Sequence, residues 1–185
     1  MKSNNKNVVI TSAVRTAIGA FDGSLKYMQG HELGSIVIKE VLKKSKLKSK
    51  DVDEVIMGQV LTAAVGQNPA RQAAIKAGIP INKTAYVVNQ VCGSGLRSVA
   101  MGYQAIRTND ASVIVAGGQE SMSNAPHAIN IRKNKKLEKS KLVDTMIKDG
   151  LWDAFNGYHM GITAENIATK WQITRKDQDD FALSS

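Results

Sequence analysis

"VNQVCGSGLRSV", residues 88–99, joins the end of a β-branched run to the start of a helix-like segment, and it contains the only cysteine of the chain. A strand, a glycine-rich turn and a helix in direct succession are typical of α/β proteins. Cys92 would then lie beside the unpaired N–H groups of a helix N-terminus, which favour a thiolate near neutral pH. Gly93 and Gly95 leave room for a substrate carbonyl, and the N–H groups of this turn are suited to bind the oxyanion formed on attack. The stretch therefore predicts an α/β fold in which Cys92 is a candidate nucleophile.

Other interpretations of the same stretch stay open on spacing alone. A free cysteine often packs as a small buried hydrophobe, and glycines between a strand and a helix also permit close packing. A dinucleotide-binding loop is disfavoured, because "GSGLRS" lacks the third glycine of that fingerprint and follows two earlier strand–helix units.

Strand-like and helix-like segments alternate on both sides of this stretch. A buried strand followed by a loop is predicted within 8–16, further strands at 52–60, 85–91 and 111–118, and helices at 31–45, 68–79 and about 94–107. The second helix has Asn68 as its N-cap, Pro69 at its first position and Gly78 as its stop signal. This alternation predicts a layered α/β domain over residues 1–120.

The helix that follows Cys92 has few strongly polar residues around its circumference. Helices of this kind are buried on more than one side. We therefore expect a second covering layer over this helix, supplied by another part of the protein or by a partner.

Residues 121–185 lack the strand–helix rhythm and are predicted to form a loop or oligomerisation region that is incomplete at its C-terminal end. Thr174 and Asp177 form a capping-box-like start for a final helix, which is still open at Ser185.

Composition excludes several classes of protein. With 43% hydrophobic and 22% charged residues among 185, the chain is of the ordinary globular kind. It has neither a signal-peptide core nor an apolar run of membrane-spanning length, and its single cysteine allows no internal disulfide or cysteine-rich metal site. We expect a cytoplasmic protein without a bound metal and without a membrane partner.

The net charge of +9 arises largely from two basic stretches, 43–50 and 131–141. Both are expected to be loop-like and solvated, and no nucleic-acid partner is expected, because no aromatic residues interleave them and no DNA-binding motif occurs.

Six segments resemble the thiolase family, and within it the acetyl-CoA acetyltransferases, in the family's order. They are "RTAIGAFDGSL" (15–25), "GQNPARQAAIKAGIP" (66–80), "VNQVCGSGLRSV" (88–99), "AGGQESMSNAPH" (116–127), "DTMIKDGLWDAFNGYHMGITAENIA" (144–168) and "RKDQDDFALSS" (175–185). The resemblance implies the N-terminal half of a layered α-β-α-β-α arrangement, with an inserted loop domain.

By this resemblance, Cys92 accepts the acyl group of an acyl-CoA and passes it to the carbanion of a second acetyl-CoA, giving acetoacetyl-CoA and CoA. Leu151, His159 and Met160 match positions that line the pocket for the pantetheine arm and the acyl group. The resemblance also implies a homotetramer and a role in fatty acid metabolism, with coenzyme A thioesters as substrates and no cofactor. His127 lies in the tetramerisation-like segment, whereas His31 is expected to be a helix-start residue.

Three family motifs do not occur in this sequence: the Gly-His-Pro histidine, the Cys-x-Gly-Gly-Gly cysteine and the Asn-Glu-Ala-Phe motif. The nucleophile therefore lacks its general base, and no candidate base is present for removal of the α-proton. We expect the 185 residues alone to be inactive and to require a complementing C-terminal half. The alternatives are a degradative 3-ketoacyl-CoA thiolase and a non-catalytic half-chain that acts in assembly.

Overall fold

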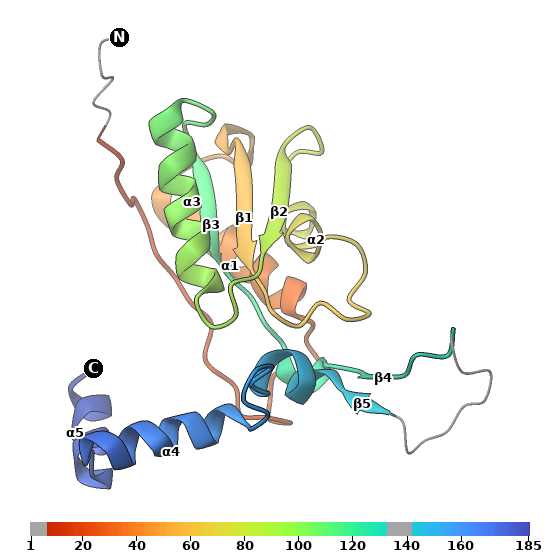
Figure 1. Cartoon of the computed structure of the whole chain (residues 1–185). Helices are drawn as coiled ribbons and strands as arrows, with labels where there is room; N and C mark the ends of the chain where they lie inside the picture. Colours follow the sequence, from red (N-terminus) through yellow and green to blue (C-terminus); the bar gives the residue numbers. More distant parts are fainter. Residues whose placement is uncertain (1–6, 133–141) are drawn as a thin grey trace.

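The computed structural model describes residues 7–132 and 142–185, and its centre is a three-stranded parallel sheet (Figure 1). The strands are β1 (Glu54–Gly58), β2 (Thr84–Val88) and β3 (Ile114–Gly118), in the order β2-β1-β3. The register aligns Glu54 with both Thr84 and Ile114. The ends of all three strands are therefore level.

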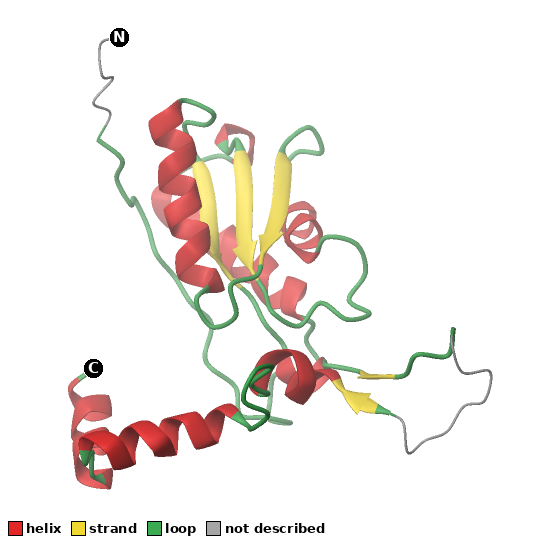
Figure 2. Ribbon diagram, in the orientation of Figure 1, coloured by secondary structure: helices red, strands yellow, loops and turns green. Residues whose placement is uncertain are grey.

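Helices cover both faces of this sheet, as parallel strands require. Helices α1 (Gly30–Ser45) and α2 (Pro69–Lys76) pack on one face, and α3 (Ser94–Thr108) packs on the other (Figure 2). Strand β1 is buried on both faces. Val55 and Met57 join the core formed with α1 and α2, and Ile56, which points to the opposite face, is fully buried as well. Each such buried side chain stabilises the fold by about 1.5–3 kcal/mol.

The predicted helices and three of the four predicted strands are confirmed, although the strands are shorter than expected. The capping prediction for α2 is also confirmed. The Asn68 side chain accepts a hydrogen bond from the Arg71 N–H at 3.1 Å, and Pro69 is the first helical residue. Gly78, just after this helix, has a φ of +89°, a backbone conformation that residues other than glycine rarely adopt.

The buried strand predicted within residues 8–16 is wrong in this structure. The segment runs as an extended chain without ladder hydrogen bonds, and Val9 and Ile10 are 70% and 80% exposed. A β-branched run forms a strand only where a neighbouring strand offers its backbone groups, and no described segment is paired with it.

Residues beyond 120 contain two short antiparallel strands and several helices. These elements are 3-10 helix η2 (Met122–Asn124), β4 (His127–Ala128), β5 (Val143–Asp144), π-helix η4 (Met146–Leu151), α4 (Met160–Trp171) and α5 (Arg175–Ser184). Helices α4 and α5 project away from the sheet (Figure 1). The capping box of α5 is confirmed, since Thr174 accepts from the Asp177 N–H at 3.2 Å and its own N–H donates to the Asp177 carboxylate at 2.8 Å.

Helix α4 was not predicted from the sequence and corrects the assignment of its residues to loop. The first basic stretch is also less loop-like than expected. Its first three residues form the last turn of α1, and 3-10 helix η1 (Ser49–Asp51) follows. Most of the second stretch, residues 133–141, lies outside the described residues. Among the helices that the structure describes, none is long and apolar enough to cross a membrane.

Candidate active site

Cys92 lies in the tight turn between β2 and α3, at the carboxyl end of the sheet, and it is exposed. The preceding residue, Val91, has a φ of +50°. For a β-branched residue this left-handed conformation is strained, and such strain costs about 1–3 kcal/mol unless neighbouring contacts hold it. The Val91 N–H donates to the Asn89 side chain at 2.9 Å, which is the first of these contacts.

The Ser94 hydroxyl, buried at the start of α3, provides the second set of contacts. It accepts a hydrogen bond from the Gln90 N–H at 2.8 Å and donates to the Val91 carbonyl at 2.6 Å. One side chain thereby joins the helix to two residues of the turn. Cys92 lies between those bonded groups, so this local network holds the backbone that carries its side chain.

Glycines allow α3 to approach the sheet closely beneath this turn. A Cβ atom on Gly58 would lie only 2.4 Å from the Ser94 carbonyl carbon and 2.5 Å from the Gly95 nitrogen. The Ser98 hydroxyl, which is fully buried, lies 2.8 Å from the Gly117 carbonyl oxygen and ties the helix to β3. The close approach therefore depends on Gly58, whereas a Cβ atom on Gly95 would come no closer than 3.8 Å to its nearest neighbour, Gly118.

Gly93 has a different place in the turn. Its N–H donates to the Gln90 carbonyl at 3.1 Å, and its carbonyl accepts from the Arg97 N–H at 2.9 Å, so it is the N-cap residue of α3. In the conformation described, this N–H is engaged by the chain itself.

Leu151, His159 and Met160 are brought together at one loop, and all three are half-buried. Leu151 ends η4, and the next residue, Trp152, forms an antiparallel bridge with His159. His159 is also the N-cap of α4, because its Nδ1 accepts a hydrogen bond from the Gly161 N–H at 2.9 Å. The histidine thus has a structural role that the sequence analysis did not identify.

This loop and the Cys92 turn lie beyond the same end of the sheet (Figure 1). Leu61, which follows β1, packs close to the loop that contains Leu151. Its side chain would lie 3.3 Å from a Cβ atom on Gly150. Among the described residues, no hydrogen bond or ion pair connects Cys92 directly with Leu151, His159 or Met160.

Glu120, just after β3, is a half-buried carboxylate at this same end that the sequence analysis missed. It accepts hydrogen bonds from the N–H groups of Val60 at 2.8 Å and Leu61 at 3.3 Å. Burial raises its pKa above the usual glutamate value, and these backbone donors partly offset that effect. The polar pair "QE" directly after an apolar strand was the only sequence signal for it.

The other two histidines lie away from the turn. His31 is in the first turn of α1, as expected, and burial together with the nearby Lys76 lowers its pKa. His127 lies in β4, with its Nε2 3.9 Å from the Asp144 carboxylate. No group of three or more His, Cys, Asp or Glu side chains within residues 7–132 and 142–185 is arranged to hold a metal ion.

Comparison with known proteins adds an independent result. A family model described as "Thiolase, N-terminal domain" matches residues 8–185. An acetyl-CoA acetyltransferase of Rhizobium meliloti (strain 1021) is 60% identical over 182 residues, which are 98% of this chain and 46% of that protein. One from Paracoccus denitrificans is 58% identical over 177 residues, covering 96% of this chain and 45% of that protein. A probable acetyl-CoA acetyltransferase of Escherichia coli (strain K12) is 51% identical over 181 residues, or 97% of this chain and 46% of that protein. The chain therefore spans about half the length of the curated relatives that it matches.

Proposed function

Because the chain belongs to the thiolase family and contains its N-terminal domain, we propose that it is the nucleophile-bearing part of an acetyl-CoA acetyltransferase. The observation that carries this proposal is the exposed Cys92, presented at the start of α3 by a strained and hydrogen-bonded turn. The relatives' names, which all specify this activity, support the choice of substrate.

In the proposed reaction, the Cys92 thiolate attacks the thioester carbonyl of one acetyl-CoA, and CoA leaves as the C–S bond to it breaks. The acetyl group is then held on Cys92 as a thioester, which divides a difficult carbon–carbon bond formation into two easier steps. The carbanion of a second acetyl-CoA attacks this acetyl group, and acetoacetyl-CoA forms while the thiolate is regenerated. The exchange of one thioester for another in the first step is nearly balanced in free energy.

The oxyanion formed in each step needs hydrogen-bond donors that are fixed in advance. We assign this role to N–H groups of the turn at Gly93 and Gly95. The Gly93 N–H donates to the Gln90 carbonyl at 3.1 Å in the free chain. To bind the oxyanion, this N–H would have to give up the Gln90 carbonyl and donate to the substrate oxygen instead. Leu151, His159 and Met160 would contact the pantetheine arm and the acyl group from the neighbouring loop.

The bases for both steps are proposed to come from the part of the polypeptide that the relatives have and this chain does not. The chain has one cysteine, and its last histidine is His159. The 185 residues alone would therefore not condense acetyl-CoA. The complete enzyme is proposed to be a cytoplasmic homotetramer that uses coenzyme A thioesters and no cofactor.

Intact-mass spectrometry after incubation with acetyl-CoA tests the proposal, with Cys92→Ala as the control. The experiment is run on the chain alone and on the chain co-expressed with the uncovered part of the Rhizobium meliloti relative. One acetyl adduct that is lost in the variant is expected at least in the second sample. Absence of an adduct from both samples would overturn the assignment of Cys92.

Two alternatives make different predictions in the same co-expressed sample. A degradative 3-ketoacyl-CoA thiolase would cleave long-chain substrates faster than acetoacetyl-CoA. A non-catalytic half-chain would assemble with the added part and yet show no activity.

A further inference from the structure

Polar side chains just after β1 and β3 hold one residue of the loop that follows β1. Leu61 is buried, and its N–H donates to the Glu120 carboxylate at 3.3 Å. Its carbonyl accepts from the Gln59 side-chain amide at 2.9 Å, and the Gln119 side chain donates to Gln59 Oε1 at 2.8 Å. Gln59 directly follows β1, and Gln119 and Glu120 directly follow β3. Both backbone groups of Leu61 are therefore fixed by side chains at the carboxyl ends of adjacent strands.

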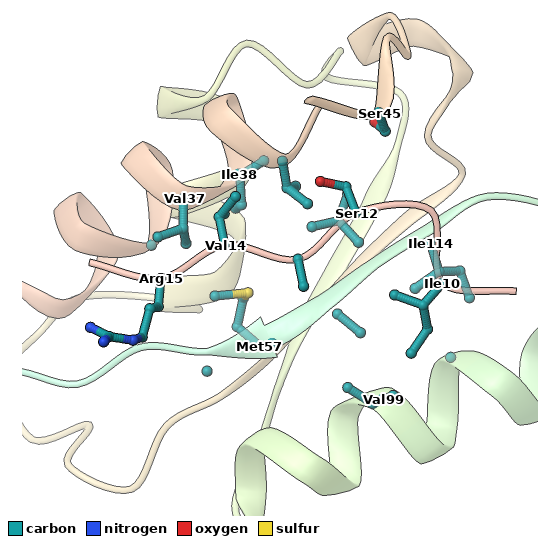
Figure 3. A pocket seen from close by; sticks show the side chains of 18 of the residues that line it. Ile10, Ser12, Val14, Arg15, Val37, Ile38, Ser45, Met57, Val99 and Ile114 are labelled. Atoms are coloured by element: carbon teal, nitrogen blue, oxygen red, sulfur yellow. The ribbon is translucent and has the colours of Figure 1, made fainter. Parts of the chain in front are cut away.

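Glu120 acts on this loop through backbone hydrogen bonds and not through an ion pair. Its carboxylate also accepts from the Val60 N–H at 2.8 Å, and no ion pair within the described part of the chain includes it. It lines a cavity of about 590 Å³ between residues 8–16 and the sheet (Figure 3). Arg15, the basic residue of that lining, donates instead to a backbone carbonyl of its own segment at 3.0 Å. Because charged acceptors form stronger hydrogen bonds than neutral ones, this carboxylate is suited to fix two successive N–H groups of a loop.

The Leu61 side chain contacts the segment that leads into the proposed substrate pocket. Its Cδ2 would lie 3.3 Å from a Cβ atom on Gly150. Gly150 lies in η4 directly before residues 151–160, the pocket loop. The antiparallel bridge between Trp152 and His159 joins the two ends of this loop. Because closely packed groups transmit displacements to one another, a shift of Leu61 would also shift the pocket loop.

We propose that Glu120 is a positioning residue for the substrate pocket, and that it acts through Leu61 on the pocket loop. The inference rests on the proposed function, because the pocket loop contains Leu151, His159 and Met160. The role does not require contact between Glu120 and substrate. Without the carboxylate, the Leu61 N–H loses its acceptor, and the pocket loop loses the fixed neighbour on which it packs.

This role predicts a specific change in the kinetics. The Cys92 turn is held by the Ser94 hydroxyl through its bonds to Gln90 and Val91, and Glu120 takes no part in those bonds. The nucleophile should therefore keep its geometry when Glu120 is replaced, whereas the pocket for the acyl and pantetheine groups loosens. A loss of substrate binding with intact chemistry raises KM and leaves kcat nearly unchanged.

The fluorescence of Trp152 tests the coupling without catalysis. Trp152 lies in the pocket loop and is 41% exposed, and a Trp171→Phe background leaves it as the only tryptophan. Its quenching constant for acrylamide is expected to rise by about 1.5-fold or more in Glu120→Ala, because local opening exposes the indole. Glu120→Gln should give a smaller rise, since its carboxamide oxygen still accepts from the Val60 N–H. An unchanged constant in both variants would overturn the proposal.

Asp53 provides a matched control at the opposite end of the sheet. Its carboxylate likewise accepts from two backbone N–H groups, those of Ser112 and Val113. Asp53→Ala should lower the urea midpoint of unfolding without a rise in the quenching constant of Trp152. A rise as large as that in Glu120→Ala would indicate general loosening of the fold and would refute the specific role. If Glu120→Ala does not fold, the comparison of Glu120→Gln with Asp53→Asn decides.

A variant of Leu61 tests the route between the carboxylate and the loop. Leu61→Ala shortens the side chain that contacts Gly150 but keeps the backbone bond to Glu120. It should raise the quenching constant of Trp152 as Glu120→Ala does, and the double variant should show no further rise, because both changes act along one route. Additive effects would contradict a route through Leu61.

Thiolysis of acetoacetyl-CoA gives the readout at the active site, in the chain co-expressed with the uncovered part of the Rhizobium meliloti relative. Glu120→Gln should raise KM by about threefold or more and change kcat by less than about twofold. A lowered kcat with an unchanged KM would contradict the positioning role. If the unmodified sample does not catalyse thiolysis, the proposed function fails, while the quenching of Trp152 still reports the coupling of Glu120 to the loop. Thiolysis by the unmodified sample with unchanged quenching in the variants would refute only the positioning role.

Discussion

The Ser94 hydroxyl donates a 2.6 Å hydrogen bond to the carbonyl of Val91, the residue directly before Cys92. Val91 has a φ of +50°, so this bond holds a β-branched residue in a conformation that it disfavours. The backbone position of the candidate nucleophile therefore depends on a serine that need not contact substrate.

Replacement of Ser94 by alanine should destabilise the chain by about 0.5–1.5 kcal/mol, because the Gln90 N–H loses its protein acceptor. The loss should be smaller by at least about 0.5 kcal/mol in a Val91→Gly background, since glycine adopts a positive φ without support. Urea unfolding of the four members of this double-mutant cycle measures the coupling. Additive effects would show that Ser94 does not act through Val91.

The reactivity of Cys92 can be measured in the same four proteins. The alkylation rate of Cys92 by iodoacetamide should change in Ser94→Ala and return toward the original rate in the double variant. A rate that is equal in all four proteins would mean that the turn does not control access to the thiol.

Gly58→Ala should be strongly destabilising, because the new Cβ would lie 2.4 Å from backbone of α3. Overpacking of this kind costs about 1–3 kcal/mol or more, since a helix must move. Gly117→Ala is the matched control, as its Cβ would meet no atom closer than 4.0 Å. Urea midpoints compare the two variants, and equal midpoints would contradict the close approach of α3 to β1.

Asp53 should contribute stability that depends on pH. Its carboxylate accepts from the N–H groups of Ser112 at 2.8 Å and Val113 at 3.1 Å, and Lys83 lies 3.3 Å away. These backbone hydrogen bonds, followed by the Lys83 contact, hold its pKa below the usual value. Because the folded pKa is lowered, the contribution is complete above the unfolded pKa of about 3.9 and is lost as pH falls through the folded value.

The matched variant is Asp53→Asn, which keeps the shape without the charge. The stability difference between the two proteins should be constant from about pH 7 to pH 5 and should shrink below about pH 4. Urea unfolding across this range measures it. A difference that grows on acidification would reverse the sign and contradict the assignment.

His159 offers a test that separates its cap from its proposed contact with substrate. His159→Asn retains a side-chain acceptor that suits an N-cap, whereas His159→Ala removes it at a cost of about 1 kcal/mol. Hydrogen exchange at the Gly161 amide should therefore rise in the alanine variant and stay near the original rate in the asparagine variant. If the imidazole also contacts substrate, both variants should slow acetyl transfer in the co-expressed sample. An asparagine variant with the original transfer rate would limit His159 to capping α4.

Much of the fold followed from local patterns in the sequence. The Asn68–Pro69 start of α2 and the Thr174 start of α5 were predicted because capping involves residues only a few positions apart. The turn at Cys92 was predicted for the same reason, since the strand, glycines and helix are contiguous. The segment at 8–16 was not predicted correctly, because a strand also requires a distant partner.

By itself, the sequence determined the alternation of strands and helices, the helix caps and the position of the single cysteine between a strand and a helix. Only the tertiary structure decided the sheet order β2-β1-β3, the contact of Gly58 with α3 and the hydrogen bond from the Val60 N–H to the Glu120 carboxylate. The physical reason is range. Caps and amphipathic periods form between neighbours in the chain, whereas sheet order and close backbone approach depend on segments tens of residues apart that meet only when the layers pack.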